Sequence, residues 1–125
     1  MATDQDIEQF IGDSFSSIWD LELLRLVVDA GDEALSKDEL VAQMRGSQLV
    51  VEQGMQSLSA AGIAALEGPN RIRFAPVNHD VERFAREALA FYQRFPGRTR
   101  RLIVARQSPG LSAFASAFRL NKEDK

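Results

Sequence analysis

SKDELVAQMRGSQLVVEQGMQSLSAAGIAALEG, residues 36–68, is the stretch that decides the fold. Ser36 and Glu39 have the spacing of a capping box, in which two side chains satisfy free backbone N–H groups at a helix start. We expect this helix to close at Gly46, since glycine commonly ends helices. Ser47 can then cap a second helix. The stretch therefore predicts two consecutive helices joined by a short turn.

Two more helices are expected before this stretch. The first lies near the N-terminus, where apolar residues recur at helical spacing: Ile7, Phe10, Ile11 and Phe15. The next stops at Gly31. Its predicted buried face consists of Trp19, Leu23, Leu26, Val27 and Ala30.

After the second helix of residues 36–68, the hydrophobic pattern changes from helical to alternating. Two short runs, 63–66 and 71–75, are joined by the turn-forming residues 67–70. In the second run apolar residues alternate with Arg71 and Arg73, which places the two arginines on one strand face. The pattern predicts a β-hairpin with a basic exposed face.

The C-terminal region is expected to be helical. A helix begins at an Asn78 cap and is interrupted at Pro96. Residues 98–107 favour another helix, although their apolar centre also fits a strand. A last short helix is expected over 111–120, followed by a frayed tail, 121–125. The helix after Asn78 has a wide apolar face: Val81, Phe84, Ala85, Ala88, Leu89, Phe91, Tyr92 and Phe95.

The composition fits one domain, residues 1–125, because 45% hydrophobic residues in a chain of this length are enough for one core. There is no apolar run of about 18 residues, the length that a membrane helix needs. The first 20 residues carry five Asp or Glu side chains, where a signal peptide would be basic and then apolar. We therefore expect a cytoplasmic protein.

No chemical motif in the chain predicts an enzyme. The absence of cysteine excludes disulfides, thiolate metal sites and cysteine nucleophiles. His79 is the only histidine, so it has no second imidazole with which to share a metal. Nucleophile elbows, phosphate-binding loops and dinucleotide glycine patterns are also missing. We expect no catalytic residue, metal or cofactor.

Charge divides the chain into two halves of opposite sign. Residues 1–67 contain three basic and 13 acidic side chains, a net charge of −10, whereas residues 68–125 contain 12 basic and five acidic ones, a net charge of +7. Such asymmetry fits a nucleic-acid surface. It equally fits two halves that attract each other within the fold or across a dimer.

Residues 18–76 resemble the winged helix-turn-helix core of bacterial transcriptional regulators of the MarR type. The resemblance is carried by residues 36–68, with their Ala61-Gly62-Ile63 exit, and by the following NRIRFAP. It implies a mainly α fold with a small β-hairpin, in which the second helix reads DNA and the hairpin is the wing. The flanking helices, including 77–120, would then build a dimer.

The reading helix has an unusual composition, because no Lys or Arg occurs between Ser47 and Gly62. Its predicted outward face consists of Leu49, Gln53, Gln56 and Ala60, with Glu52 and Ser57 at the edges. Glutamine can pair with the adenine edge, and apolar side chains can contact the thymine methyl group. Phosphate contacts would come from cations outside the helix. The candidate DNA- or partner-binding residues are Arg45, Ser47, Gln48, Leu49, Gln53, Gln56, Ser57, Arg71 and Arg73.

The same face also fits other roles. Protein interfaces are poor in Lys and tolerate uncharged polar groups, so an adaptor that binds a protein and no DNA is the alternative; a purely structural helix is a third possibility. A secondary basic patch of Arg98, Arg100 and Arg101 could contact DNA backbone or the acidic half of a partner subunit. A surplus of aromatic residues predicts a homodimer: Phe84, Phe91, Tyr92, Phe95, Phe114 and Phe118.

Overall fold

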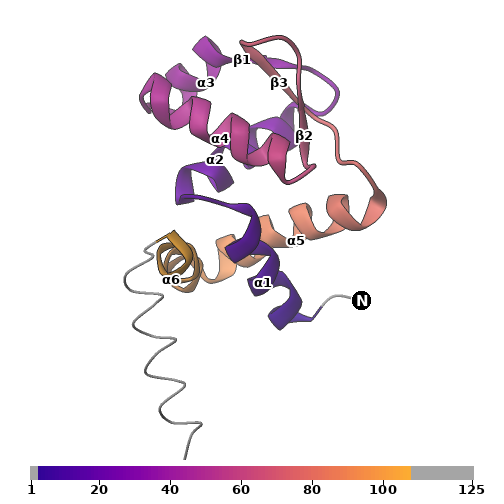
Figure 1. The fold of residues 1–125 in the computed structure, drawn as a ribbon, viewed down its shortest axis with the longest axis vertical. Helices are drawn as coiled ribbons and strands as arrows, with labels where there is room; N and C mark the ends of the chain where they lie inside the picture. Colours follow the sequence, from indigo (N-terminus) through magenta and orange to yellow (C-terminus); the bar gives the residue numbers. More distant parts are fainter. Residues whose placement is uncertain (1–2, 108–125) are drawn as a thin grey trace, which may run out of the picture.

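Within residues 3–107, six helices and a small antiparallel sheet make up the fold (Figure 1). The structure is a computed structural model and describes residues 3–107. The chain is mainly helical, as predicted. In chain order the elements are α1 (Asp4–Ser14), α2 (Ile18–Ala30), β1 (Leu35–Ser36), α3 (Lys37–Met44), α4 (Gln48–Ala60), β2 (Ala64–Leu66), β3 (Arg71–Phe74), α5 (His79–Arg94) and α6 (Pro96–Gln107).

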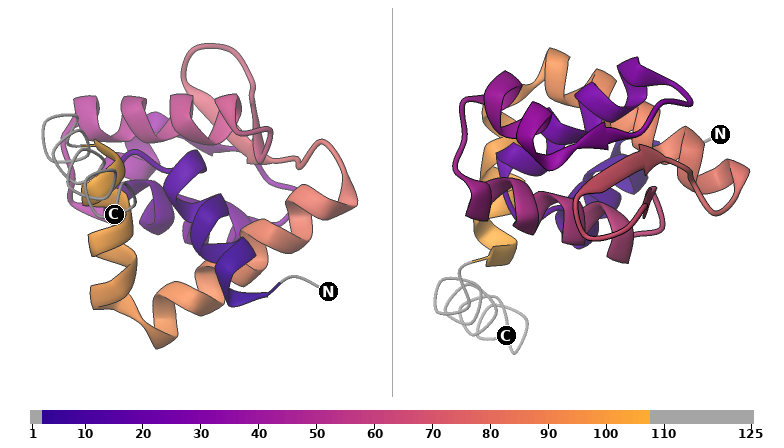
Figure 2. Two further views of the ribbon diagram at one scale, coloured as in Figure 1. Left: turned by 60° about the horizontal axis from the view of Figure 1, so that its bottom comes forward. Right: turned by 90° about the horizontal axis from the view of Figure 1, so that it is seen from above.

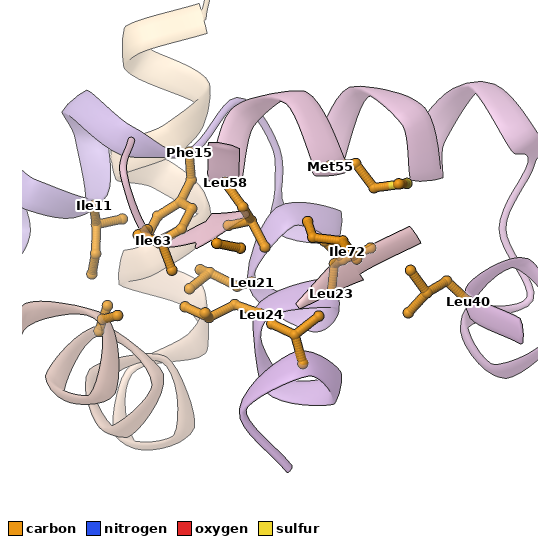
Figure 3. Close-up of a cluster of buried hydrophobic side chains, with 14 of the residues drawn as sticks. Ile11, Phe15, Leu21, Leu23, Leu24, Leu40, Met55, Leu58, Ile63 and Ile72 are labelled. Carbon is orange, nitrogen blue, oxygen red and sulfur yellow. The ribbon is translucent and has the colours of Figure 1, made fainter. Parts of the chain in front are cut away.

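The centre of the fold is α2, which contacts α4, α3 and β3 as well as α5 and α6. Its apolar side chains are buried on more than one face of the helix, because other elements surround it. Figure 3 shows Leu21, Leu23 and Leu24 within the cluster of buried side chains that also contains Leu58 and Ile72. The sequence predicted only one buried face, since periodicity alone does not reveal a helix that is covered from several sides.

Trp19 is an exception to the predicted buried face of α2, and its expected burial was wrong. The side chain is 37% exposed. It lies over the turn between α3 and α4, where a Cβ atom placed on Gly46 would be 3.7 Å from Trp19 Cζ3. An indole ring at the edge of the core covers this turn and keeps part of its surface in solvent.

The turn between α3 and α4 differs by one residue from the prediction. The helix ends at Met44, and the left-handed residue that ends it is Arg45 (φ 54°, ψ 34°) rather than Gly46. A side chain in this conformation costs about 1–2 kcal/mol relative to glycine. The surrounding structure holds Arg45 in this conformation, two residues before the Ser47 cap of α4.

The hairpin is part of a three-stranded sheet with the order β1-β3-β2. The predicted strands β2 and β3 pair antiparallel, with Leu66 opposite Ile72. The sequence did not predict β1, whose Leu35 pairs with Ile72 on the other edge of β3. A strand of two residues is too short to show a period of two, so only the tertiary pairing reveals it.

The C-terminal helices enclose α1. Asn78 caps α5 as predicted, since its Oδ1 accepts from the backbone N–H of Val81 at 2.8 Å. Pro96 begins α6, which settles the open choice for residues 98–107 in favour of a helix. Figure 2 shows α1 in the angle between α5 and α6, and both helices contact it. The helix expected over 111–120 and the tail 121–125 lie outside the described residues.

The central strand provides a test of the core. We predict that Ile72→Ala lowers the free energy of unfolding by about 2–5 kcal/mol, because a fully buried isoleucine is replaced by a cavity. Leu66→Ala is the matched control, since Leu66 lies opposite Ile72 on the same sheet face but is 36% exposed. Urea denaturation of both variants makes the measurement. Equal losses of unfolding free energy in the two variants would contradict this packing.

Candidate nucleic-acid interface

The outward face of α4 is the main candidate site, and its orientation agrees with the helical periodicity of the sequence. Val51, Met55 and Leu58 are buried against the core. Leu49 on the opposite side is 61% exposed, the second highest value among the exposed large hydrophobic residues of the described chain. The predicted face of Leu49, Gln53, Gln56 and Ala60 is exposed, together with Gln48 and Glu52.

Two of the predicted site serines have structural roles. The Ser47 hydroxyl accepts from the backbone N–H of Val50 at 3.1 Å and so caps α4. Ser57 is partly buried, and its hydroxyl lies 3.0 Å from that of Ser16 in the α1–α2 connection. The two serines therefore hold the start and the side of α4 in place.

A buried carboxylate fixes α4 against α2. Asp20 is 1% exposed, and its Oδ2 accepts from the backbone N–H of Ser16 at 2.6 Å. A Cβ atom on Gly54 would lie 3.3 Å from Asp20 Oδ1, so glycine permits the close approach of α4 at this point. Burial raises the pKa of Asp20, while hydrogen bonds from Ser16, Ser57 and Ser17 oppose the rise.

An open hollow of about 900 Å³ borders the exposed face of α4. It extends from Ser16 and Ser17 in the α1–α2 connection to Leu66 and Pro69 in the hairpin. The hairpin loop therefore borders the same hollow as α4. From α4 itself the lining consists of Leu49, Glu52, Gln53, Met55, Gln56 and Ser57.

The cations around α4 fall into two groups. Arg45 and Arg71 are exposed, and no ion pair of the described residues involves either of them. Lys37, by contrast, places its Nζ 2.8 Å from Glu52 Oε1 on α4. Arg73 places its Nε 2.6 Å from Glu67 Oε2. Half of the four cations are thus already paired with a carboxylate.

The two hairpin arginines share the sheet face opposite the core, as predicted. Ile72 is buried, whereas Arg71 is exposed and Arg73 is partly exposed. Leu66, which lines the hollow, belongs to the inner face together with Ile72. Among the three expected anchors, Arg45 lies closest in the chain to α4, and Arg71 directly follows the hairpin loop.

The secondary basic patch is in a different part of the molecule. Arg98, Arg100 and Arg101 lie on α6, which packs against α1 and α5 and is well separated from α4 in Figure 1. Arg98 forms an ion pair with Glu8 of α1. This contact joins the basic and acidic halves of the chain within one molecule, which is one of the two interpretations that the charge pattern left open.

Aromatic residues of the C-terminal region have partners inside the chain. Phe84 stacks on Phe10 of α1 with a centroid distance of 5.3 Å, and Phe91 contacts Phe95 at 5.1 Å. Phe114 and Phe118 lie outside the described residues. The expected homodimer stays a prediction, because these contacts account for part of the aromatic surplus without a second copy.

Metal and membrane sites were searched over residues 3–107. No group of three or more His, Asp or Glu side chains there has an arrangement that could hold a metal ion. None of the helices in this range has both the length and the apolar character to cross a membrane. His79, the first residue of α5, is exposed.

Sequence reasoning missed three residues that shape this site: Asp20, Lys37 and Ser16. Asp20 looked like an ordinary charged residue near a helix start, and only the packing of α4 buries it. The partner of Lys37 is 15 residues away on the next helix. The adjacent serines of SFSSIWD, typical of helix capping, were the only local signal for Ser16.

The buried carboxylate predicts a pH effect. Because the folded pKa of Asp20 is raised above its ordinary value of 3.8, the unfolded chain releases this proton first as pH increases, and the contribution of Asp20 to stability falls. We therefore expect Asp20→Asn to gain stability relative to the parent protein as pH rises above 3.8. Urea denaturation across a pH series makes the comparison.

The control for this experiment is Asp80→Asn, which removes the same charge from an exposed position on α5. At each pH, the difference in the free energy of unfolding between Asp80→Asn and the parent protein is subtracted from the corresponding difference for Asp20→Asn. If the corrected difference for Asp20→Asn shrinks or stays constant as pH rises, hydrogen bonding rather than burial dominates the Asp20 carboxyl.

Comparison of the chain with models of known protein families, with curated proteins and with solved structures finds no match.

Proposed function

We propose that the protein is a non-enzymatic, cytoplasmic transcriptional regulator that binds double-stranded DNA through the exposed face of α4. The observation that carries the proposal is the uncovered row of Gln48, Leu49, Gln53 and Gln56 on a helix that is anchored firmly by its opposite face. In this arrangement the backbone of α4 is fixed and the base-reading side chains are free.

The order of elements from α2 to β3 supports this proposal. Helix, strand, helix, helix and a strand hairpin follow one another, which resembles the winged-helix arrangement. A helix that projects from such a core fits the major groove, whose width admits one α-helix. The hairpin loop at Pro69 borders the same hollow as α4, so the wing would lie next to the reading helix on the duplex.

The chemistry of the face favours A·T base pairs. Gln53 and Gln56 can each pair with the N6 and N7 atoms of adenine, and Leu49 can contact a thymine methyl group. Arg45 and the free backbone N–H groups at the start of α4 are placed for phosphate contacts. The homodimer stays a prediction within this proposal, and two copies would place two α4 helices about one turn of DNA apart.

Selection from a pool of random duplexes at low salt, followed by fluorescence anisotropy on the enriched sequence, tests the proposal. We expect Gln53→Ala or Gln56→Ala to reduce discrimination at the contacted base pair by about 1–3 kcal/mol. Gln93→Ala, an exposed glutamine on α5, is the control and should leave the preference unchanged. Absence of both enrichment and low-salt binding would refute DNA binding.

Arg45→Gly separates binding from folding. Glycine adopts the left-handed conformation of residue 45 without strain, so the variant should be at least as stable as the parent protein. It should nevertheless bind all duplexes more weakly, with a logarithmic salt slope smaller by about 0.9, because one phosphate contact is lost. An unchanged slope would remove Arg45 from the interface.

Protein binding through the same face is the second candidate, and the exposed Leu49 favours it. Leu49 and Leu66 both line a hollow whose cation Lys37 is paired with Glu52. A neutral, partly apolar surface of this kind suits a protein partner better than a polyanion. If the protein does not bind DNA, this adaptor role is the function that we propose.

Affinity purification with quantitative mass spectrometry tests the second candidate. We expect Leu49→Asp to lose the partner that the parent protein retains, because a carboxylate would be placed in an apolar contact. Val104→Asp adds the same charge at another exposed apolar residue, on α6, and should retain that partner. A partner that both variants retain would not use α4.

A further inference from the structure

Two carboxylates near α4 and the hairpin are paired with cations that could otherwise bind phosphate. Glu52 lies 2.8 Å from Lys37, and Glu67 lies 2.6 Å from Arg73. Both pairs are at the α4 and hairpin side of the molecule, where a phosphate contact would require the cation to be free. Arg45 and Arg71 have no such partner among the described residues.

We propose that Glu52 and Glu67 are specificity-determining residues, which compete with DNA phosphate for Lys37 and Arg73 and thereby suppress sequence-independent binding. The inference rests on the proposed DNA-binding function. Non-specific affinity for DNA comes almost entirely from phosphate neutralisation, so cations that are held by internal carboxylates contribute little to it. Base contacts of Gln53 and Gln56 then form a larger share of the total affinity.

The geometry allows the competition to be reversible. Both carboxylates are well exposed, whereas the Lys37 side chain is only 18% exposed. Ion pairs with one partner open to solvent can still be exchanged for another anion. The backbone of Lys37 is fixed, because its N–H donates to the Asn70 carbonyl at 2.7 Å. Only the end of the side chain therefore needs to move from Glu52 to a phosphate.

The position of Glu52 also separates it from an ordinary surface charge. It lies on α4 one residue before Gln53 and lines the same hollow. A carboxylate there repels the phosphates that flank the groove, and among the major-groove base edges it can accept a hydrogen bond only from the amino groups of cytosine and adenine. Glu52 therefore lowers the affinity for every duplex whose base contacts do not offset this repulsion.

Substitution by glutamine tests the inference, because Glu52→Gln and Glu67→Gln keep size and hydrogen bonding but remove the charge. Each variant should raise the affinity for a scrambled duplex by about eightfold at about 0.1 M salt and increase the salt slope by about 0.9, since one more cation becomes available. The affinity for the selected duplex should rise less in proportion than that for the scrambled one. Fluorescence anisotropy over a salt series measures both.

Glu82→Gln is the matched control, since it breaks the Arg86–Glu82 ion pair on α5 and changes the net charge by the same amount. It should leave affinity and slope nearly constant. If Glu82→Gln raises affinity as much as the interface variants do, overall charge is responsible and the inference is wrong. The inference is also wrong if the parent protein and both interface variants bind DNA with one common slope, although DNA binding itself would then stand. If none of the folded proteins binds even at low salt, DNA binding fails as well.

Discussion

The close crossing of α2 and α4 at Gly54 positions the candidate binding residues of α4. A side chain at this position would have to shift the Asp20 carboxylate by a few tenths of an ångström, since its Oδ1 is 3.3 Å from the site of a Cβ atom. Asp20 in turn accepts from the Ser16 backbone and from the hydroxyl of Ser57 on α4. Glycine inside a helix weakens that helix by about 0.5–1 kcal/mol relative to alanine, and here the contact between helices offsets the loss.

This anchoring has a consequence for recognition. Because hydrogen bonds and apolar contacts fix the inner side of α4, the outer side can consist of small and amide side chains that do not contribute to folding. Base readout requires such a rigid backbone, since hydrogen bonds to base edges depend on position within a few tenths of an ångström. The same rigidity would serve a protein interface, which is why electrostatics rather than shape distinguishes the two candidate functions.

Much of the fold could be predicted from local signals, whereas the pairing of charged side chains could not. Capping residues Ser36, Ser47 and Asn78 marked helix starts correctly, and the alternation at Ile72 identified the main strand. The strand β1 and the exposure of Trp19 depend on contacts between distant segments, so no local pattern contains them. Lys37 and Arg73 are cations in the sequence, but only the folded chain places Glu52 and Glu67 beside them.

Charge pairing also changes how the polarity of the chain is to be understood. The opposite charges of the two halves are paired with each other only in part. One such pair joins Arg98 of α6 to Glu8 of α1. Around α4, acidic and basic groups pair locally and leave Arg45 and Arg71 as the cations without a carboxylate partner in the described chain. A surface with few free cations gains little from the phosphate backbone. A larger share of any affinity that such a surface has for DNA would therefore come from the bases that Gln53 and Gln56 can reach, which makes selectivity the property on which this fold would depend.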